Sequence, residues 1–266
     1  MNSFDFTRFG SITGRRVLDL GAGGGRHAIE AAMRGAIVVC VELDPGALEG
    51  IPSQVERATE FLGLERGTLA AQVLLIKADA RALPFADGSF DLVIAAEILE
   101  HIVCDARALA EIYRVLVPGA KVGISVPRAF PEAVNWLLSK QYHAVAGGHV
   151  RIYGKRELKG KLAKIGLVEI RHAYAHGLHS PYWWLKSLVG IENRNNALVE
   201  RYHRMLVGQI MGESPRLDSI ERALNPLLGK SIVFYGSRPR VDSAGEVAVQ
   251  LVDILTTDTT DSNRAD

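Results

Sequence analysis

Short apolar segments alternate with amphipathic segments along the first half of the chain. The apolar segments are rich in β-branched residues, which is typical of parallel strands buried on both faces. The segments between them repeat apolar residues every three to four positions, as helices that cover a sheet do. We therefore expect an α/β fold with a Rossmann-like, doubly wound sheet. The expected strands are residues 16–20, 37–42, 73–77, 90–95 and 121–126, and the expected helices are residues 26–34, 45–62 and 105–116, the last closed by Pro118-Gly119.

The pattern is less regular in the second half of the chain. Residues 176–230 are far too many for a turn between two strands and predict an inserted helical cap. The organisation that follows is one catalytic domain over residues 1–240 and a polar C-terminal tail over residues 241–266. The other expected elements are a short helix within residues 127–140, a loop over 141–153 that overhangs the active site, a helix at 155–165, and strands at 167–174 and 231–235.

The composition is that of an ordinary globular protein, with 48% hydrophobic and 23% charged residues. The formal net charge is only +1, so no overall field attracts nucleic acid or an anionic membrane. The two cysteines, Cys40 and Cys104, form no spacing that would suggest a zinc site or a disulfide framework. The first residues lack the basic start and apolar run of a signal peptide, and no apolar stretch is long enough to span a membrane. We expect a cytoplasmic protein.

The most informative motif is Val17-Leu18-Asp19-Leu20-Gly21-Ala22-Gly23-Gly24-Gly25, in which an expected strand runs into a glycine-rich turn and then a helix. Glycine lets a ligand approach the backbone closely, and the following helix offers unpaired N–H groups. The motif is not a dinucleotide fingerprint, because GxGxxG would require glycine at the position of Arg26. An acid before the first glycine is unfavourable beside a pyrophosphate, whereas Asp19 suits a cationic amino-acid moiety.

This motif resembles the first motif of class I S-adenosylmethionine-dependent methyltransferases, an acid followed by alternating glycines. Later landmarks agree: Glu42 ends the second strand, Asp79 follows the third, and Leu83-Pro84-Phe85 and Phe90-Asp91 precede and open the fourth. The resemblance implies seven strands, the last antiparallel, and S-adenosylmethionine as the cofactor, with Glu42 on the ribose hydroxyls and Asp79 beside the adenine amine. Each acid alone is equally consistent with a turn or a helix cap. The cofactor-binding residues that we assign are Asp19, Gly21, Ala22, Gly23, Glu42, Asp79, Ala80 and Glu97.

Within this family the chain resembles the branch of ubiquinone- and menaquinone-biosynthesis methyltransferases (methyltransferase type 11), also through the segment Gly148-His149-Val150-Arg151-Ile152-Tyr153. The resemblance implies methylation of an oxygen or carbon of a small-molecule or lipid-like acceptor. An S-adenosylmethionine-binding protein without transfer activity, or a non-methylating relative such as an aminopropyl transferase, stays open as an alternative. Nucleic-acid methylation is disfavoured, because residues 96–99 read Ala-Glu-Ile-Leu where amino-methylating DNA enzymes carry Asn/Asp-Pro-Pro-aromatic.

Two histidines are the candidate catalytic residues. Methyl transfer mainly requires alignment, but a hydroxyl or acidic carbon acceptor benefits from a base with a pKa near the working pH. His101 follows the fourth strand and His149 lies in the loop after the fifth, where an acceptor would bind. We expect the two to face the sulfonium from opposite sides of the cleft. A structural role for either histidine is the alternative.

The segment Glu97-Ile98-Leu99-Glu100-His101 resembles the divalent-metal site of ubiquinone-biosynthesis O-methyltransferases. Two carboxylates and an imidazole could hold Mg²⁺ or a similar ion that polarises an acceptor hydroxyl. Acids at the start of a helix with a packing histidine follow the same spacing. We assign no metal ligand from the sequence and keep the metal site as an alternative.

An aromatic cluster, Tyr182-Trp183-Trp184, lies in the expected cap and is followed by Lys186. Such residues usually serve a core, and here they would anchor the cap to the sheet. The alternative is an apolar wall over the acceptor, or a peripheral contact with a membrane surface in which Lys186 reaches toward headgroups. This second interpretation implies a hydrophobic acceptor such as a quinone or prenyl lipid.

Overall fold

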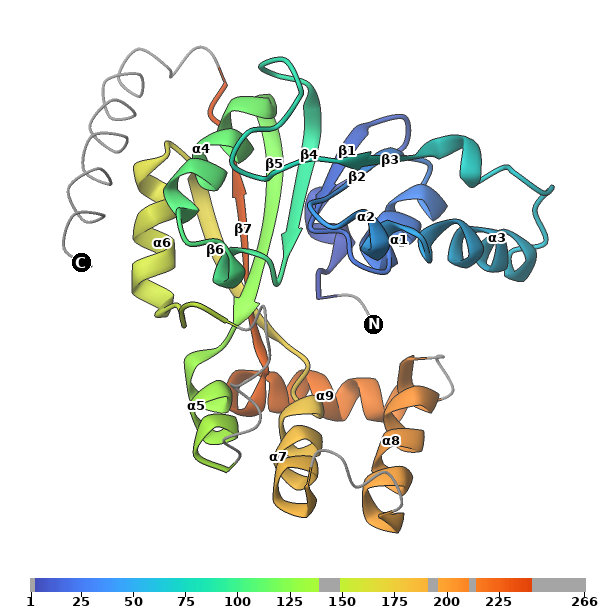
Figure 1. Ribbon diagram of the computed structural model, residues 1–266, viewed down its shortest axis with the longest axis vertical. Coiled ribbons are helices and arrows are strands. Elements are labelled where there is room, and N and C mark those ends of the chain that lie inside the picture. Colours follow the sequence, from blue (N-terminus) through green and yellow to red (C-terminus); the bar gives the residue numbers. More distant parts are fainter. Residues whose placement is uncertain (1–2, 139–148, 191–195, 211–213, 241–266) are drawn as a thin grey trace.

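Seven strands form one mixed sheet in the order β3-β2-β1-β4-β5-β7-β6 in this computed structural model, which describes residues 3–138, 149–190, 196–210 and 214–240 (Figure 1). Neighbouring strands are parallel except at β7, which pairs antiparallel with both β5 and β6. The α/β fold class and the antiparallel last strand are therefore confirmed. The strands are β1 (Arg16–Leu20), β2 (Ile37–Glu42), β3 (Val73–Lys77), β4 (Phe90–Ala96), β5 (Leu116–Pro127), β6 (Val168–Ala175) and β7 (Ser231–Ser237).

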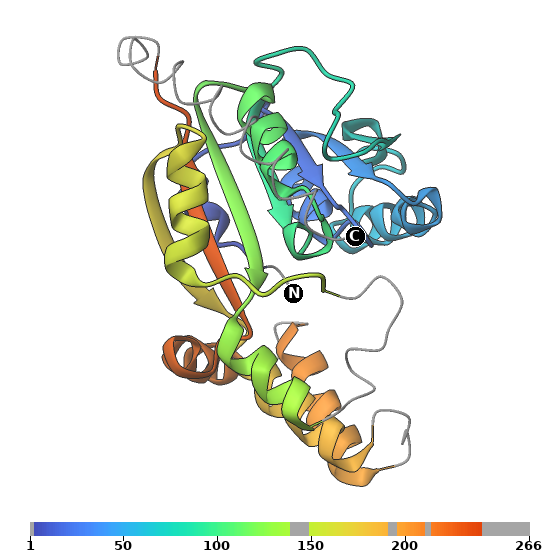
Figure 2. The ribbon, with the colours of Figure 1, turned by 60° about the vertical axis from the view of Figure 1, so that its left-hand side comes forward.

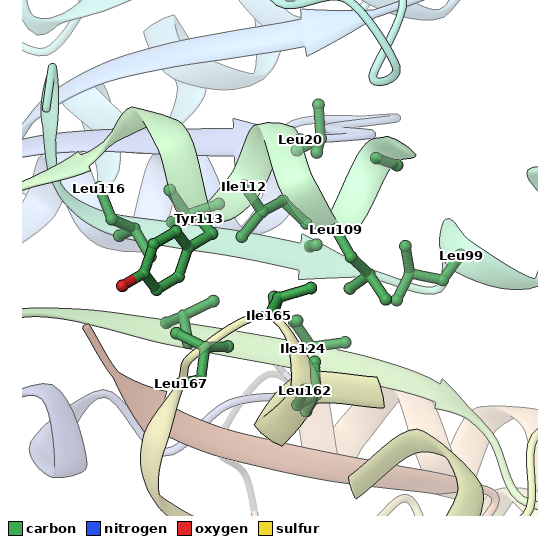
Figure 3. Packing of buried hydrophobic residues seen from close by; sticks show 14 of the residues in the cluster. Leu20, Leu99, Leu109, Ile112, Tyr113, Leu116, Ile124, Leu162, Ile165 and Leu167 are labelled. Carbon is green, nitrogen blue, oxygen red and sulfur yellow. The ribbon is translucent and has the colours of Figure 1, made fainter. Parts of the chain in front are cut away.

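Helices cover both faces of the sheet because successive strand residues point to opposite sides. Val17 of β1 packs in the core under α1 (Arg26–Met33) and α3 (Ile51–Phe61), whereas Leu18 packs in the core on the other face. Figure 3 shows this second core, which joins the sheet to α4 (Asp105–Val115) and α6 (Lys155–Lys164). Its labelled members include Leu109 and Ile112 of α4, Ile124 of β5, and Leu162 of α6.

The helices expected at 26–34, 105–116 and 155–165 each end one residue earlier in the structure, and the helix expected at 45–62 is interrupted. The helix expected at residues 45–62 is divided into α2 (Pro45–Leu48) and α3, because Pro52 lacks a backbone N–H and occupies the first turn of α3, where no donor is needed. The helix expected at 105–116 ends at Val115. Pro118-Gly119 lies within β5, where the pairing with β4 shifts register, so this dipeptide forms an irregularity in the strand instead of closing a helix.

Four helices lie beyond the carboxyl ends of β4 and β5 (Figure 1). They are α5 (Ala129–Leu138), α7 (His179–Val189), α8 (Ala197–Ile210) and α9 (Pro215–Leu228). The last three follow β6 and precede β7, as the predicted cap does, and α5 lies along this cap in Figures 1 and 2. Leu178, Tyr182, Val199 and Leu206 form a separate small core inside the cap.

The aromatic residues of the cap are in packing contacts, but with the core of the cap and with α5, whereas the first interpretation expected them to anchor the cap to the sheet. Tyr182 is buried in the cap core, and Trp183 packs against that core. Trp184 donates a hydrogen bond from Nε1 to the carbonyl of Pro131 in α5, at 3.3 Å. None of the helices among the described residues is both long and apolar enough to cross a bilayer. The expected tail at 241–266, like most of the expected loop at 141–153, lies outside the described residues.

Candidate active site

A cavity of about 780 Å³ opens at the carboxyl ends of strands β1 to β4. The strand order changes direction between β1 and β4, and doubly wound sheets bind ligands in the crevice at such a point. The cavity is lined by six residues that the sequence singled out, namely Gly21, Glu42, Asp79, Ala80, Glu97 and His101. Four others, Asp19, Ala22, Gly23 and His149, are not among its lining residues.

The glycine turn is held by hydrogen bonds to the end of β2. The N–H groups of Gly21 and Ala22 donate to the carbonyl of Val41, and the N–H of Gly23 donates to Oε1 of Glu42 at 2.6 Å. Gly21 has a φ of +71°, and a Cβ on it would lie 2.6 Å from Cδ1 of Ile98. A larger residue at position 21 would therefore be strained and would displace a residue of the cavity wall.

Asp19 lies on β1 behind the glycine turn and is fully buried. Neither carboxylate oxygen makes a hydrogen bond of normal geometry with the described residues. Burial raises the pKa of Asp19 to about 7, although the nearby backbone N–H of Ala28 and the charge of Arg26 oppose this effect. A buried hydrogen-bond acceptor is unfavourable unless a donor reaches it. The ammonium group of an amino-acid moiety is a strong donor. The residues of the turn thus fit a cofactor of that kind.

Asp79 and Arg81 form a polar corner of the cavity after β3. The guanidinium of Arg81 contacts the carboxylate of Asp79 at 2.6 Å, and its backbone N–H donates to the same group at 2.8 Å. Hydrogen bonds from Arg81 lower the pKa of Asp79, which is therefore ionised at neutral pH. Arg81 itself lines the cavity. The sequence analysis missed Arg81, although its place two residues after an acid at a strand end was a usable signal.

Glu97 stands where β4 ends, with a φ of +53° that is unusual for a residue other than glycine. Its N–H donates to the carbonyl of Ser125, and the hydroxyl of Ser125 donates to Oε1 of Glu97 at 3.0 Å. Burial raises the pKa of Glu97, although Lys230 and Ser125 act in the opposite direction. These two contacts with β5 hold the Glu97 carboxylate beside the cavity.

His101 and His149 lie side by side, with ring centroids 5.0 Å apart and an edge-to-face arrangement. The expectation that they occupy opposite sides of the cleft is therefore wrong. The reason is a backbone contact, since the N–H of Val150 donates to the carbonyl of Glu100 at 2.9 Å. This bond brings the segment before α6 onto the short helix that carries His101.

A buried acid completes this group of side chains. Oε1 of Glu132 lies 2.8 Å from Nδ1 of His149, and the Glu132 side chain is only 1% exposed. Glu132 belongs to α5, and the sequence analysis missed it. Nothing in the local pattern distinguishes this acid, because only the packing of α5 at the carboxyl end of β5 brings it near His149.

Comparison with known proteins assigns the fold. A family model described as a methyltransferase domain matches residues 18–124. That range includes the glycine turn and the acids that follow strands β2, β3 and β4. The chain contains a class I S-adenosylmethionine-dependent methyltransferase domain. S-adenosylmethionine is therefore the cofactor of this methyltransferase domain. Glu132 and His149 lie outside the matched residues.

Characterised relatives resemble the methyltransferase domain over part of their length. The chain is 35% identical over 119 residues to O-methyltransferase rstn1 of Aspergillus nomiae, covering 44% of this chain and 49% of that protein. It is 35% identical over 113 residues to the demethylmenaquinone methyltransferase of Clavibacter sepedonicus, covering 42% of this chain and 41% of that protein. The chain thus spans about half the length, or less, of the curated relatives that it matches.

Solved structures share the fold of the methyltransferase domain. Phosphoethanolamine N-methyltransferase 2 of Haemonchus contortus, in complex with S-adenosyl-L-methionine, aligns over 88% of this chain and 51% of that chain, with a TM-score of 0.54 and 24% identity. The cyclase SpnF aligns over 88% of this chain and 79% of that chain, with a TM-score of 0.56 and 18% identity. At these identities the likeness concerns the fold alone.

The potential metal ligands that lie close together are not the same three residues as in the sequence motif Glu97-x-x-Glu100-His101. One ligand atom each from Glu100, His101 and His149 lies within 4.8 Å of the other two, whereas Glu97 is not part of this group. Glu100 is 1% exposed, and neither of its carboxylate oxygens has a hydrogen-bond partner among the described residues. Burial and the nearby charge of Glu97 raise the pKa of Glu100 to about 9. His149, and not Glu97, completes this group because the N–H of Val150 donates to the carbonyl of Glu100 and brings His149 beside the motif.

Proposed function

We propose that the protein transfers a methyl group from S-adenosylmethionine to a hydroxyl group of a small apolar acceptor. The observation that carries the proposal is the pairing of His149 with the buried carboxylate of Glu132 beside His101, which lines the cavity. A histidine oriented by a buried acid can act as a general base. The bound cofactor would supply a methyl group already activated by the sulfonium.

We propose that the acids at the strand ends hold the cofactor as the family resemblance implies. Glu42 would accept hydrogen bonds from the ribose, and Asp79 would lie beside the adenine amine. Asp19 would receive the amino group of the methionine moiety through its two unpartnered oxygens. Gly21 lets the cofactor approach the backbone, because any side chain there would collide with Ile98.

His149 would act as the base. Contact with Glu132 through Nδ1 leaves Nε2 to accept the proton of the acceptor hydroxyl, and the buried carboxylate stabilises the imidazolium that forms. His149 would take this proton as the acceptor oxygen accepts the methyl group that the bound cofactor would supply, with S-adenosylhomocysteine as the other product. His101 lies against His149 and would hold the acceptor in line.

The walls near His101 favour an apolar acceptor. Ile98, Ile102 and Val103 line the cavity on this side. The likeness to an O-methyltransferase and to a demethylmenaquinone methyltransferase supports a ring-bearing or lipid-like molecule over a nucleic acid. We further propose that residues 1–240 act as one domain, in which the helices between β6 and β7 cover the acceptor. The packing of Trp183 and Trp184 within the cap removes them as a reason for proposing a membrane contact.

A second way of activating the same hydroxyl is a divalent cation held by Glu100, His101 and His149. The close approach of their ligand atoms and the two unpartnered oxygens of Glu100 support it. Glu100→Gln decides between the two mechanisms, because it removes one proposed ligand and keeps the shape of the side chain. If His149 is the base, Glu100→Gln leaves turnover intact. If a cation activates the acceptor, Glu100→Gln abolishes turnover, as does dialysis against a chelator, and Mg²⁺ or Zn²⁺ restores the turnover of the dialysed wild-type protein.

Methyl transfer itself needs a direct test, because a cyclase shares the fold and a cofactor-binding protein without transfer activity would have the same turn. We would incubate the protein with methyl-labelled S-adenosylmethionine and fractionated cell extract, and identify labelled products by mass spectrometry. The expected result is S-adenosylhomocysteine formation only when an acceptor fraction is present, with the label on oxygen. Cofactor binding without any labelled product in any fraction would contradict the proposal.

A further inference from the structure

A second group of potential ligands lies where the cap joins the sheet. It consists of His176, which directly follows β6, His179, the first residue of α7, and Glu221 of α9. One ligand atom from each lies within 4.8 Å of the other two. None of the three lines the cofactor cavity. The group therefore belongs to neither the cofactor site nor the pair of histidines beside it.

Two atoms of this group are buried and face each other without a hydrogen bond. Nδ1 of His179 lies 3.8 Å from Oε1 of Glu221, which is too long for a hydrogen bond. Neither atom has another hydrogen-bond partner among the described residues. Zinc bonds of about 2.0–2.2 Å place two ligands of a tetrahedral ion about 3.4 Å apart. A separation of 3.8 Å is close to that value, so a small rotation of either side chain would let both atoms bind one ion.

The outer contacts of the group orient its ligands. Nε2 of His176 lies 3.0 Å from the hydroxyl of Ser3, which leaves Nδ1 as the ligand atom when Nε2 carries the proton. Oε2 of Glu221 accepts a hydrogen bond of 2.6 Å from Nε2 of Gln209, which leaves Oε1 toward His179. Metal-binding histidines and carboxylates in proteins are held in this way by a second hydrogen bond away from the ion.

We propose that His176, His179 and Glu221 bind a zinc ion, which connects α7 and α9 of the cap to the end of β6. Two imidazoles and one carboxylate match the donors that Zn²⁺ prefers, and three protein ligands leave one position for water. The site would brace the cap, because it joins α9 to the junction between β6 and α7, which lies far from α9 in the chain.

The test is zinc binding to the full chain by titration calorimetry, in the background His101→Ala/His149→Ala so that the other cluster cannot contribute. We expect one Zn²⁺ per chain with a dissociation constant in the micromolar range or tighter. Saturating Zn²⁺ should raise the melting temperature by about 5–10 °C. Adding His179→Ala should weaken binding by at least about 100-fold, and Ser3→Ala by about tenfold through loss of the outer contact.

His203→Ala is the matched control, because His203 is an exposed histidine of the same cap outside the group. It should bind Zn²⁺ as the background does. If His179→Ala fails to fold by circular dichroism, Glu221→Gln is measured in its place. No zinc binding in the folded background variant, or binding that His179→Ala or Glu221→Gln leaves unchanged, would overturn the proposal.

Discussion

Nδ1 of His149 lies 2.8 Å from Oε1 of Glu132, an acid that is almost completely buried. The two residues come from different parts of the chain, Glu132 from α5 and His149 from the segment before α6. A buried carboxylate at this distance can hold the orientation of the imidazole, which the proposed base requires. The contact exists because α5 packs at the carboxyl end of β5.

Replacing Glu132 with glutamine should lower kcat without changing cofactor affinity. The amide keeps the shape of the side chain but removes the charge that stabilises the imidazolium, so turnover should fall by about 10²-fold or more. Glu200→Gln, on an exposed position of α8, is the control. An unchanged kcat for Glu132→Gln would show that the pair is structural.

Gly21→Ala should weaken S-adenosylmethionine binding by about tenfold or more, equivalent to about 1.4 kcal/mol. The new Cβ would lie 2.6 Å from Cδ1 of Ile98 and would push this residue into the cavity. Gly63→Ala separates the clash from backbone strain, because Gly63 also has a positive φ, +65°, but a Cβ added there would have no atom within 4 Å. Calorimetry should find normal affinity for Gly63→Ala. Equal losses in both variants would contradict a local effect on the cavity.

Glu42→Ala should weaken cofactor binding by about 1.5–3 kcal/mol, the usual cost of losing hydrogen bonds to a charged group. Part of the loss would come from the N–H of Gly23, which donates to this carboxylate. Asp44→Asn is the matched comparison, since Asp44 also lines the cavity but caps α2 by accepting from the N–H of Gly46. If Asp44→Asn loses affinity and Glu42→Ala does not, Asp44 is the acid that binds the ribose.

Asp105 should make the stability of the fold depend on acid pH. Burial alone would raise the pKa of Asp105, but hydrogen bonds from Lys161 and Tyr153, together with the charge of Arg151, lower it. An acid with a lowered pKa stabilises the folded state above its unfolded pKa of about 3.9, and this contribution disappears as the pH falls through the folded pKa.

Unfolding in denaturant should therefore show wild-type stability falling as the pH decreases below about 4, and Asp105→Asn should fall less steeply over the same range. At neutral pH the substitution should cost about 2 kcal/mol, which is less than for a fully buried pair because Lys161 and Arg151 remain 32% and 26% exposed. Parallel curves for the two proteins below pH 4 would refute this role.

Trp184→Ala should lower the melting temperature and leave the acceptor KM nearly unchanged. The indole joins α7 to α5 through the Pro131 carbonyl and packs near Phe130, so its removal should cost about 2 kcal/mol for a partly buried side chain. Leu188→Ala, at a position of the same helix that is 69% exposed, is the control. A raised KM at constant melting temperature would instead place Trp184 on the wall of the acceptor site.

The periodicity of apolar residues and the glycines that mark turns were sufficient to predict most of the fold. The bounds of β1, β2 and β3 were predicted to the residue, because buried parallel strands carry a strong local signal. The division between α2 and α3 was missed, although Pro52 was visible in the sequence. A proline is compatible both with the first turn of a new helix and with a break in a longer one, so it did not decide between them. The acids at the strand ends were predictable for the same local reason, since each follows a recognisable strand.

By itself the sequence determined the class of fold, the glycine turn and the acids that line one cavity, because each depends on residues close together in the chain. The tertiary structure alone decided which distant side chains meet. Glu132 reaches His149, His101 lies beside His149, and His176 and His179 meet Glu221 only because the helices after β5 and β6 pack together at one end of the sheet. No local periodicity encodes such contacts, because they depend on how the helices and loops pack against one another.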